Sequence, residues 1–357
     1  MKIIPIVFSS DTNYLPYLSV SIQSIIDNAN SKNLYKIYIL TTGIEDIARD
    51  TLLTMMQDNV SIEFIDINKY IDNLDKTNLH IDGHITIATY FRLFISDIFT
   101  QYDKILYADC DVIFMRDITD LFDTDLSDAY LAAVPDIGLI YNSERYPDQD
   151  YYRDILGLES IERYFNAGIL VYNLDAIRKS TIRQDLLLTL NTFKKPLFHD
   201  QCILNKVFRE HVKFLPMNWN YWGNFKADNP NYKQNFPKKY IKDFENASKN
   251  PYCIHYKPWV NPYVEYAYLF WHYARKTPFY EIILYKNICP RVPKTESKQK
   301  NLFFIRFFES KKHTGIHPVF LINVFTWIKY SHRIFTGTTT VFTTISLGQW
   351  MNIATII

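Results

Sequence analysis

Two aspartates, two residues apart, follow an apolar run and are the pair in this chain best suited to bind a metal ion. The run covers residues 104–108, and Asp109-Cys110-Asp111 comes directly after it. Side chains two positions apart on an extended backbone point to the same side. Two carboxylates at a strand end can therefore share one hard divalent cation. Such a cation would neutralise the diphosphate of a nucleotide-sugar and help it leave, which favours a metal-dependent sugar transferase.

The residues on either side of this triplet strengthen the interpretation. Apolar side chains precede Asp109 and follow Asp111, so both carboxylates are expected to be largely buried. Burying two carboxylates without a counter-charge costs several kcal/mol, so a cation or a basic partner must compensate. The alternative to a metal ion is an ion pair with Arg92 or Arg116.

Composition excludes several classes of protein. The 357 residues carry a net charge of +1, so no overall field favours binding to nucleic acid. The four cysteines have no CxxC spacing, which argues against a zinc site and favours reduced, buried thiols in a cytoplasmic protein. They are Cys110, Cys202, Cys253 and Cys289.

Strands and helices alternate at the start of the chain. Apolar runs predict strands at 3–8, 35–40 and 61–67, and helical spacing predicts helices at 16–26 and 44–56. This alternation is typical of a parallel α/β sheet, in which ligands bind at the carboxyl ends of the strands. Asp11 follows the first strand and Asp109 ends a later one, so both lie where a ligand is expected.

The rest of the chain up to residue 290 predicts further elements of both kinds. Helices are expected at 86–99, 200–208, 262–276 and 277–287, and strands at 131–134 and 168–173. Residues 218–240 are rich in Asn, Lys, Pro and aromatic side chains, and we expect a long loop with little regular structure there.

The C-terminal tail differs in composition from the rest. Residues 291–300 are polar and basic and predict a linker, while 301–335 combine aromatic side chains with five basic residues and one acid. This favours a helix pair on an anionic membrane surface, with a helical cap on the catalytic domain as the alternative. Residues 334–357 carry no charge, but their threonines and glycines argue against a membrane span.

Six short motifs, in this order along the chain, resemble the family 8 retaining glycosyltransferases. They are FSSDTNY (8–14), ATYFRL (88–93), LYADCD (106–111), YFNAG (164–168), HDQ (199–201) and HYKPW (255–259). The family includes bacterial lipopolysaccharide α-glucosyl- and α-galactosyltransferases and, more distantly, the glycogenins. The resemblance covers about residues 4–280.

The resemblance implies a fold and a domain organisation. It implies an α/β fold of the GT-A type, a Rossmann-like nucleotide-sugar-binding domain with a mixed central sheet, over residues 1–262. Helices packed on that domain would follow over 263–290, and the linker and membrane-associating tail would occupy 291–357.

The resemblance also implies which residues bind the donor. Asp11 and Asn13 match residues that hold the uracil and ribose, and Arg92 matches an arginine directed toward the diphosphate. A carboxylate can accept from the imide N–H, and a guanidinium gives bidentate phosphate contacts. The alternatives are turn residues for the first two, and a salt bridge of Arg92 with Asp109 or Asp97.

By the same resemblance, His255 completes the metal site of Asp109 and Asp111, and Lys257 reaches the phosphates. An imidazole ligand suits Mn²⁺ better than Mg²⁺, so manganese is favoured and magnesium stays possible. Most relatives have several residues, often with a glycine, between this histidine and lysine, whereas this chain has only Tyr256. Lys257 therefore either approaches from a different angle or belongs to a remodelled closing loop.

Four more residues match positions around the transferred sugar. Asp200 would bind donor hydroxyls, and Gln201 would lie under the anomeric carbon. Retention by double displacement needs a carboxylate nucleophile, and glutamine is a poor one, so a front-face route is favoured. Asp136 and Asn166 match residues that line the sugar and acceptor pocket, with a strand-end cap and a turn as their alternative roles.

These residues together predict retaining transfer of glucose or galactose from a UDP-sugar to a saccharide or glycolipid acceptor. Lipopolysaccharide core is the acceptor that the family favours, and the tail favours a cytoplasmic enzyme peripheral to the inner face of the membrane. A sugar nucleotidyltransferase is one alternative, but residues 8–14 lack its Gly-rich loop and basic residue. A catalytically impaired saccharide-binding or membrane scaffold protein is the other, favoured only by the short segment between His255 and Lys257.

Overall fold

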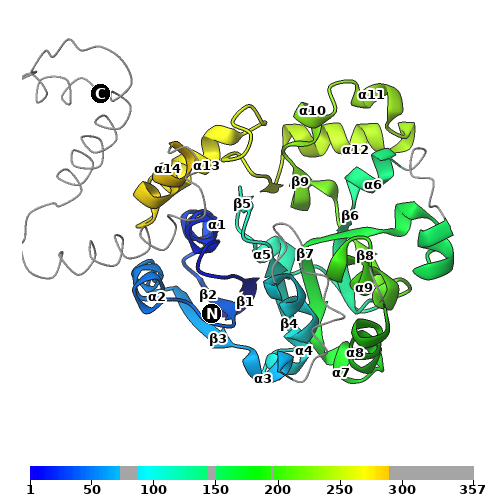
Figure 1. Cartoon of the computed structure of the whole chain (residues 1–357), viewed down its shortest axis with the longest axis horizontal. Helices are drawn as coiled ribbons and strands as arrows, with labels where there is room; N and C mark the ends of the chain where they lie inside the picture. The colour runs from blue at the N-terminus through cyan, green and yellow to red at the C-terminus, as the bar shows by residue number, and fades with distance from the viewer. Residues whose placement is uncertain (73–86, 143–149, 194–195, 289–357) are drawn as a thin grey trace, which may run out of the picture. The chain divides into compact units, whose positions relative to one another are not determined.

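A large and a small β-sheet form the frame of the computed structural model, which describes residues 1–72, 87–142, 150–193 and 196–288 (Figure 1). Met1–Pro290 form one compact unit. The tail predicted at 291–357 lies outside the described residues, so its membrane association stays a prediction. Within the part of the chain that the structure describes, no helix is both long and apolar enough to span a bilayer.

The large sheet has seven strands in the order β3-β2-β1-β4-β7-β6-β8. Their bounds are β1 Lys2–Ser9, β2 Asn33–Thr41, β3 Val60–Asp66, β4 Lys104–Ala108, β6 Leu131–Pro135, β7 Phe165–Asn173 and β8 Val212–Phe214. Strands β3, β2, β1 and β4 run parallel, β7 runs antiparallel to β4 and to β6, and β8 runs parallel to β6. The sheet is therefore mixed, as the resemblance implies.

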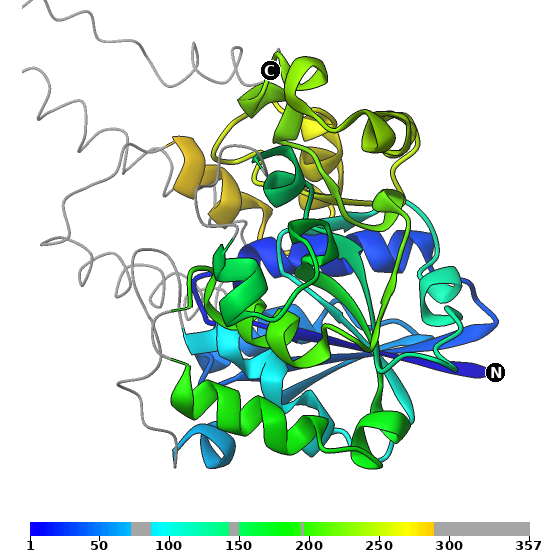
Figure 2. The same cartoon turned by 90° about the vertical axis from the view of Figure 1, so that its right-hand side faces the viewer.

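Helices cover both faces of this sheet (Figure 2). They are α1 Leu15–Asn28, α2 Asp46–Leu53, α3 Asn68–Ile71, α4 Ile95–Ile98, α5 Thr119–Phe122, α6 Ile137–Asn142, α7 Leu174–Arg178, α8 Ile182–Thr192, α9 His199–Phe208, α10 Phe225–Asp228, α11 Tyr232–Asn235, α12 Lys238–Lys249, α13 Ala267–Ala274 and α14 Tyr280–Ile288. Shorter helical segments are the 3₁₀ helices η2 Ile87–Phe94, η4 Ile161–Arg163 and η5 Met217–Asn220, and the π-helix η3 Tyr151–Ile155.

Strand β1 shows why helices are needed on both faces. Its side chains alternate, so Ile6 and Phe8 join a buried apolar cluster with α1, while Val7 joins a second cluster with η2 and α9. A strand that is buried on both faces has a continuous apolar run in its sequence. The sequence pattern at 3–8 is of this kind.

The small sheet brings together the two chain segments that carry the candidate metal ligands. Its order is β5-β10-β9, with β5 Val112–Phe114, β10 Cys253–His255 and β9 Tyr221–Trp222. β10 runs antiparallel to β5 and parallel to β9, and His255 pairs with Val112. This pairing brings His255 beside the residue that follows Asp111, although the two strands are far apart in sequence.

One buried asparagine fixes helix α9 against β7. Asn205 Oδ1 accepts from the Phe165 N–H, and its Nδ2 donates to the Phe165 carbonyl, both at 2.8 Å. Its side chain is fully buried, so both polar ends need these partners. One turn earlier in α9, Gln201 therefore lies opposite Ala167.

One sequence prediction is wrong, and a second is confirmed only in part. Residues 218–240 are not a long loop, because η5, β9, α10, α11 and the start of α12 lie there. Its aromatic side chains are core residues: Phe225 and Phe236 pack on Phe244 of α12 at ring-centroid distances of 5.0 and 5.4 Å. The helix expected at 86–99 is present over Ile87–Ile98, but Ile87–Phe94 is a 3₁₀ helix and only Ile95–Ile98 is in α-conformation.

Other predictions are confirmed with shifted boundaries. The strands at 3–8, 35–40, 61–67, 131–134 and 168–173 and the helices at 16–26 and 200–208 are present. The helices expected at 44–56 and 262–276 are shorter, at Asp46–Leu53 and Ala267–Ala274. Three cysteines, Cys110, Cys202 and Cys253, are free and buried as expected, and the fourth lies outside the described residues.

Candidate functional site

Asp109, Asp111 and His255 converge where the two sheets meet. Asp109 follows β4, Asp111 precedes β5, and His255 ends β10. His255 Nε2 lies 3.1 Å from Asp111 Oδ1 and 3.9 Å from Asp109 Oδ2, and one ligand atom of each residue lies within 4.8 Å of the others. Two carboxylate oxygens and an imidazole nitrogen at this spacing could hold one divalent cation.

Backbone hydrogen bonds hold the two aspartates in place. The Asp109 N–H donates to the Gly168 carbonyl at 2.8 Å, and the Tyr256 N–H donates to the Asp111 carbonyl at 3.1 Å. The Tyr107 hydroxyl donates to Asp109 Oδ1 at 3.0 Å. The positions of the carboxylates therefore follow from strand pairing and do not depend on a flexible loop.

Gly168 on β7 gives the imidazole its place. A Cβ atom at this position would lie 2.6 Å from His255 Cε1 and 2.7 Å from His255 Nδ1, which is too close for any side chain. The ring can therefore rest on the backbone only where the residue is glycine. Sequence reasoning placed Gly168 in a motif without recognising this contact, because a close approach between distant segments has no local signal.

Asn220 fixes one proton of His255 on Nδ1. The directions of the hydrogen bonds that lead to this nitrogen follow from the Gly168 N–H. That N–H must donate, so Asn166 Oδ1 accepts it at 2.9 Å and also accepts Asn220 Nδ2 at 2.8 Å. Asn220 Oδ1 then faces His255 Nδ1 at 3.1 Å and accepts its proton. Burial lowers the pKa of His255, but the charges of Asp111 and Asp109 and the hydrogen bond to Asp111 raise it above its ordinary value, so without a metal ion Nε2 donates a proton toward Asp111 Oδ1. Once that proton is lost, the Nε2 lone pair is directed at the aspartates, as metal binding requires.

The same chain of hydrogen bonds continues to Gln201. Asn166 Nδ2 donates to Asp136 Oδ2 at 3.1 Å, and Gln201 Nε2 donates to the same oxygen at 3.2 Å. Gln201 Oε1 accepts from the Ala167 N–H at 2.9 Å. Both ends of the Gln201 amide are therefore oriented, and the second lone pair of its carbonyl is available to a cationic centre.

Asp136 combines two functions in this arrangement. Its Oδ1 accepts from the Leu139 N–H at 3.1 Å near the start of α6, and its Oδ2 accepts the two amide groups just described. The strand-end cap considered from the sequence is thus present. The same side chain also orients Asn166 and Gln201.

Arg92 neutralises two carboxylates at once. Its Nη2 lies 3.0 Å from Asp109 Oδ1, and its Nε lies 2.9 Å from Asp200 Oδ2. Its Nη1 donates to the Ala167 carbonyl at 2.5 Å, and the guanidinium lies over the Tyr107 ring at 4.5 Å. The ion pair with Asp109 expected as an alternative is therefore present, whereas Asp97 pairs with Arg183.

Asp200 is a buried carboxylate in an unusual state. Burial raises the pKa of Asp200 to about 7. The positive charge of Arg92 opposes this increase without cancelling it, and the negative charge of Asp109 adds to it. Among the described residues, no hydrogen bond reaches its Oδ2, although Arg92 lies close. This oxygen is shielded from solvent and faces the Arg92 guanidinium.

Lys257 lies beside the candidate metal site in spite of the short spacing from His255. Its Nζ is 3.5 Å from Asp111 Oδ2. Burial alone would raise the pKa of Asp111, but the charges and hydrogen bond of His255, with Lys257, hold it well below its usual range. Trp259 stacks on Tyr17 of α1, with ring centroids 4.1 Å apart, and anchors the segment.

Asp11 and Asn13 lie in the turn between β1 and α1, at the same end of the sheet as Asp109. Asp11 Oδ1 accepts from the Tyr14 N–H at 2.9 Å, so the turn function expected as an alternative is present. The Asn13 carbonyl accepts from Lys286 Nζ at 3.1 Å, which ties this turn to α14. All the residues predicted for the site thus belong to elements that meet at one edge of the sheet or border it.

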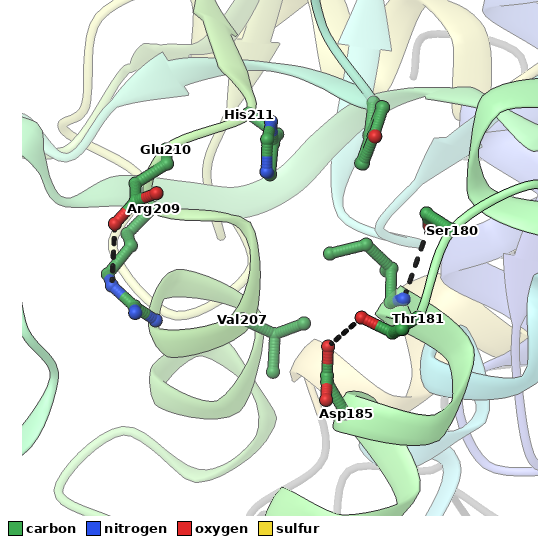
Figure 3. Close-up of a pocket in the computed structure, with 9 residues that line it drawn as sticks. Ser180, Thr181, Asp185, Val207, Arg209, Glu210 and His211 are labelled. Atoms are coloured by element: carbon green, nitrogen blue, oxygen red, sulfur yellow. Dashed lines mark hydrogen bonds and ion pairs between the residues drawn. The ribbon is translucent and has the colours of Figure 1, made fainter.

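A separate hollow lies at the opposite end of β6 (Figure 3). Its polar side chains contact one another: Thr181 donates to Asp185 at 2.8 Å, and Arg209 lies 3.7 Å from Glu210. Tyr130 stacks on His211 at 4.4 Å. None of the predicted site residues lines this hollow, so it is not the candidate site.

Comparison with known proteins places these motifs in one family. The family described as "Glycosyl transferase family 8" matches residues 5–262. A putative glycosyltransferase of Haemophilus influenzae is 33% identical over 220 residues, which cover 60% of this chain and 62% of that protein. A lipopolysaccharide 1,2-glucosyltransferase of Escherichia coli is 27% identical over 332 residues, covering 90% of this chain and 88% of the relative.

Solved structures with the same fold include two glycosyltransferases. The bifunctional glycosyltransferase WbbM in its apo form has a TM-score of 0.71 and 30% identity over 80% of this chain and 52% of its own. The galactosyltransferase LgtC, in complex with donor and acceptor sugar analogs, has a TM-score of 0.59 and 24% identity over 82% of this chain. The chain thus spans about half of WbbM and less than two thirds of the Haemophilus relative.

The hydrogen bond from His255 to Asn220 predicts a defect in metal binding. Asn220→Ala should weaken Mn²⁺ binding by roughly 10- to 100-fold, because Nδ1 loses the acceptor that fixes the ring and its tautomer. Calorimetric titration with Mn²⁺ measures this. The control is Asn218→Ala on the same 3₁₀ turn, whose amide donates to the Asn250 carbonyl at 2.7 Å. Equal Mn²⁺ affinity in the two variants would contradict the assignment.

The state of Asp200 predicts a pH-dependent stability. Its folded pKa of about 7 exceeds the value of about 3.9 in an unfolded chain, so its favourable contribution exists at low pH and is lost as the pH rises through 7. Asparagine does not titrate. The free energy of unfolding of Asp200→Asn, relative to wild type, should therefore increase by about 2–3 kcal/mol from about pH 5 to pH 8. Urea unfolding in chelator tests this, and a difference that does not vary with pH would refute it.

Proposed function

Since the chain belongs to glycosyl transferase family 8, we propose that it transfers a hexose, glucose or galactose, from a UDP-sugar to a saccharide acceptor with retention of configuration. One observation carries this proposal. The three candidate metal ligands converge, and a continuous hydrogen-bond chain connects His255 to Gln201.

The leaving-group side of the reaction would lie at Asp109, Asp111 and His255. A divalent cation bound there, Mn²⁺ by the preference of the imidazole and Mg²⁺ as the other candidate, would offset the charge that develops on the diphosphate. Lys257 lies on the Asp111 side of this site and would add a further positive charge toward the phosphates.

Arg92 serves this site as a buried counter-ion. Its N–H groups already face the Thr89 carbonyl, the Ala167 carbonyl and Asp109, so it would position the carboxylates and add positive potential near the diphosphate. The turn of Asp11 and Asn13, at the end of β1, would hold the uridine.

Gln201 and Asp200 would act on the transferred sugar. The Gln201 carbonyl, oriented by the Ala167 N–H, would stabilise the oxocarbenium-like charge at the anomeric carbon. Asp200 matches the family position that binds hydroxyls of the donor sugar and would bind them here. Of the carboxylates near Gln201, Asp136 is held by three donors and Asp200 is paired with Arg92. This supports a front-face route, in which the leaving diphosphate takes the proton of the acceptor hydroxyl.

The acceptor and the location of the enzyme are inferred from one relative and from the composition of the tail. The similarity to a lipopolysaccharide 1,2-glucosyltransferase over 90% of this chain supports lipopolysaccharide core as the acceptor. The basic, aromatic composition of 301–335 supports a cytoplasmic enzyme peripheral to the inner face of the membrane. Family membership disfavours the sugar nucleotidyltransferase. A catalytically impaired binding protein differs from the proposed enzyme by lacking turnover.

The metal site predicts a large loss of activity in Asp111→Ala. Removing this ligand should lower UDP release from UDP-glucose or UDP-galactose with Mn²⁺ by about 10²- to 10³-fold, because the diphosphate loses several kcal/mol of charge stabilisation. Excess chelator should abolish wild-type turnover, and Mn²⁺ should restore it.

The matched control is Asp58→Ala, an exposed aspartate outside the site, with thermal unfolding of both variants in chelator to verify the fold. Near-normal turnover of Asp111→Ala, or activity unchanged in excess chelator, would refute a metal-dependent transferase. Binding of a UDP-sugar with no hydrolysis and no transfer would instead identify a binding protein.

A further inference from the structure

Trp222 on β9 is an exposed tryptophan in register with His255 of the candidate metal site. Its exposed fraction is 38%, whereas the preceding residue, Tyr221, is 1% exposed. The alternation of a strand explains the difference, since Tyr221 points into the core and Trp222 points to the opposite face. Leaving a large apolar ring in water is unfavourable, so a ligand that covers it would gain free energy.

Strand pairing places Trp222 beside the candidate metal site. In the parallel pair of β9 and β10, Trp222 is in register with His255, and the following Gly223 N–H donates to the His255 carbonyl at 3.1 Å. Helices α6, α10, α11 and α12 gather beside β9 (Figure 1). The indole ring also packs on Phe225 of α10, with ring centroids 5.8 Å apart, which limits its freedom.

Gly138 in α6 leaves the space that the indole ring occupies. A Cβ atom on Gly138 would lie 2.7 Å from Trp222 Cζ3 and 3.3 Å from Asp136 Oδ1. The ring and the Asp136 carboxylate therefore border the same point, and any side chain at 138 would displace the ring. The opposite oxygen of Asp136 holds Gln201, so Trp222 lies across this carboxylate from the position proposed for the transferred sugar.

We propose that Trp222 is the platform on which the acceptor saccharide stacks, and that it determines acceptor affinity. This rests on the proposed function. A pyranose ring has an apolar face of C–H groups and polar edges, so an exposed indole can cover that face while the hydroxyls stay hydrogen-bonded. The donor sugar occupies the other side of Asp136, which leaves the acceptor as the ring's partner.

The test separates transfer to a saccharide from transfer to water. UDP release from UDP-glucose and UDP-galactose is measured with Mn²⁺, first without acceptor and then with rising concentrations of methyl glucosides, methyl galactosides and lactose. Trp222→Ala should raise the acceptor KM at least roughly fivefold, while hydrolysis without acceptor and the donor KM stay within about twofold of wild type. Trp222→Phe should retain part of the acceptor affinity.

Tyr268→Ala on α13, an exposed aromatic residue away from Gly138, is the control and should leave all three quantities unchanged. An equal fall of hydrolysis and transfer in Trp222→Ala would assign the ring a purely structural role and overturn the proposal. Unchanged acceptor KM would overturn it as well.

A binding measurement keeps the inference independent of turnover. With UDP and Mn²⁺ present, saccharide titration should change the tryptophan fluorescence of the wild type, and the change should be lost in Trp222→Phe. If no UDP-sugar is hydrolysed or transferred, the proposed function fails, yet this titration still tests the platform. No saccharide-dependent change in the wild type, or an equal change in Trp222→Phe, would overturn it.

Discussion

The hydrogen bond donated by the Gly168 N–H is the constraint on which the rest of the site depends. Because a backbone N–H can only donate, it sets the orientation of Asn166, then of Asn220, and then the tautomer of His255. On the other side, the same Asn166 amide donates to Asp136, which orients Gln201. One strand of the large sheet thus aligns the three candidate metal ligands with Gln201, and the absence of a side chain at Gly168 also makes room for the imidazole.

The negative charges of the buried aspartates are balanced by a separate set of ion pairs. Asp109 and Asp200 share Arg92, while Asp111 faces His255 and Lys257. An ion pair of this kind is costly to bury and is weak support for stability alone. Its consequence here is positional: Asp109 and Asp111 keep fixed places beside one another, ready for a shared cation. Burial, with a smaller contribution from the negative charge of Asp109, raises the pKa of Asp200 in spite of Arg92.

The sequence was sufficient to predict the site residues that belong to a local pattern. Asp109 and Asp111 follow a strand, and Asp11 follows another, so their convergence at one sheet edge could be predicted, and the resemblance supplied His255 and Gln201. Asn220, Gly138 and Trp222 were missed. The strands of the small sheet are two or three residues long, which is too short to show any periodicity. The sequence around β9 mixes polar and aromatic residues as a loop would, and only the packing against α12 shows that the aromatic side chains are buried. The contact of Gly168 with His255 joins segments that only the tertiary structure brings together.

The most direct test of the central claim is an anomalous difference map from crystals of the protein soaked with Mn²⁺ and UDP. We expect one strong manganese peak bound by Asp109, Asp111 and Nε2 of His255, with Nδ1 of that ring still facing Asn220. A map with no peak at this place, or with manganese bound through other residues, would contradict the account.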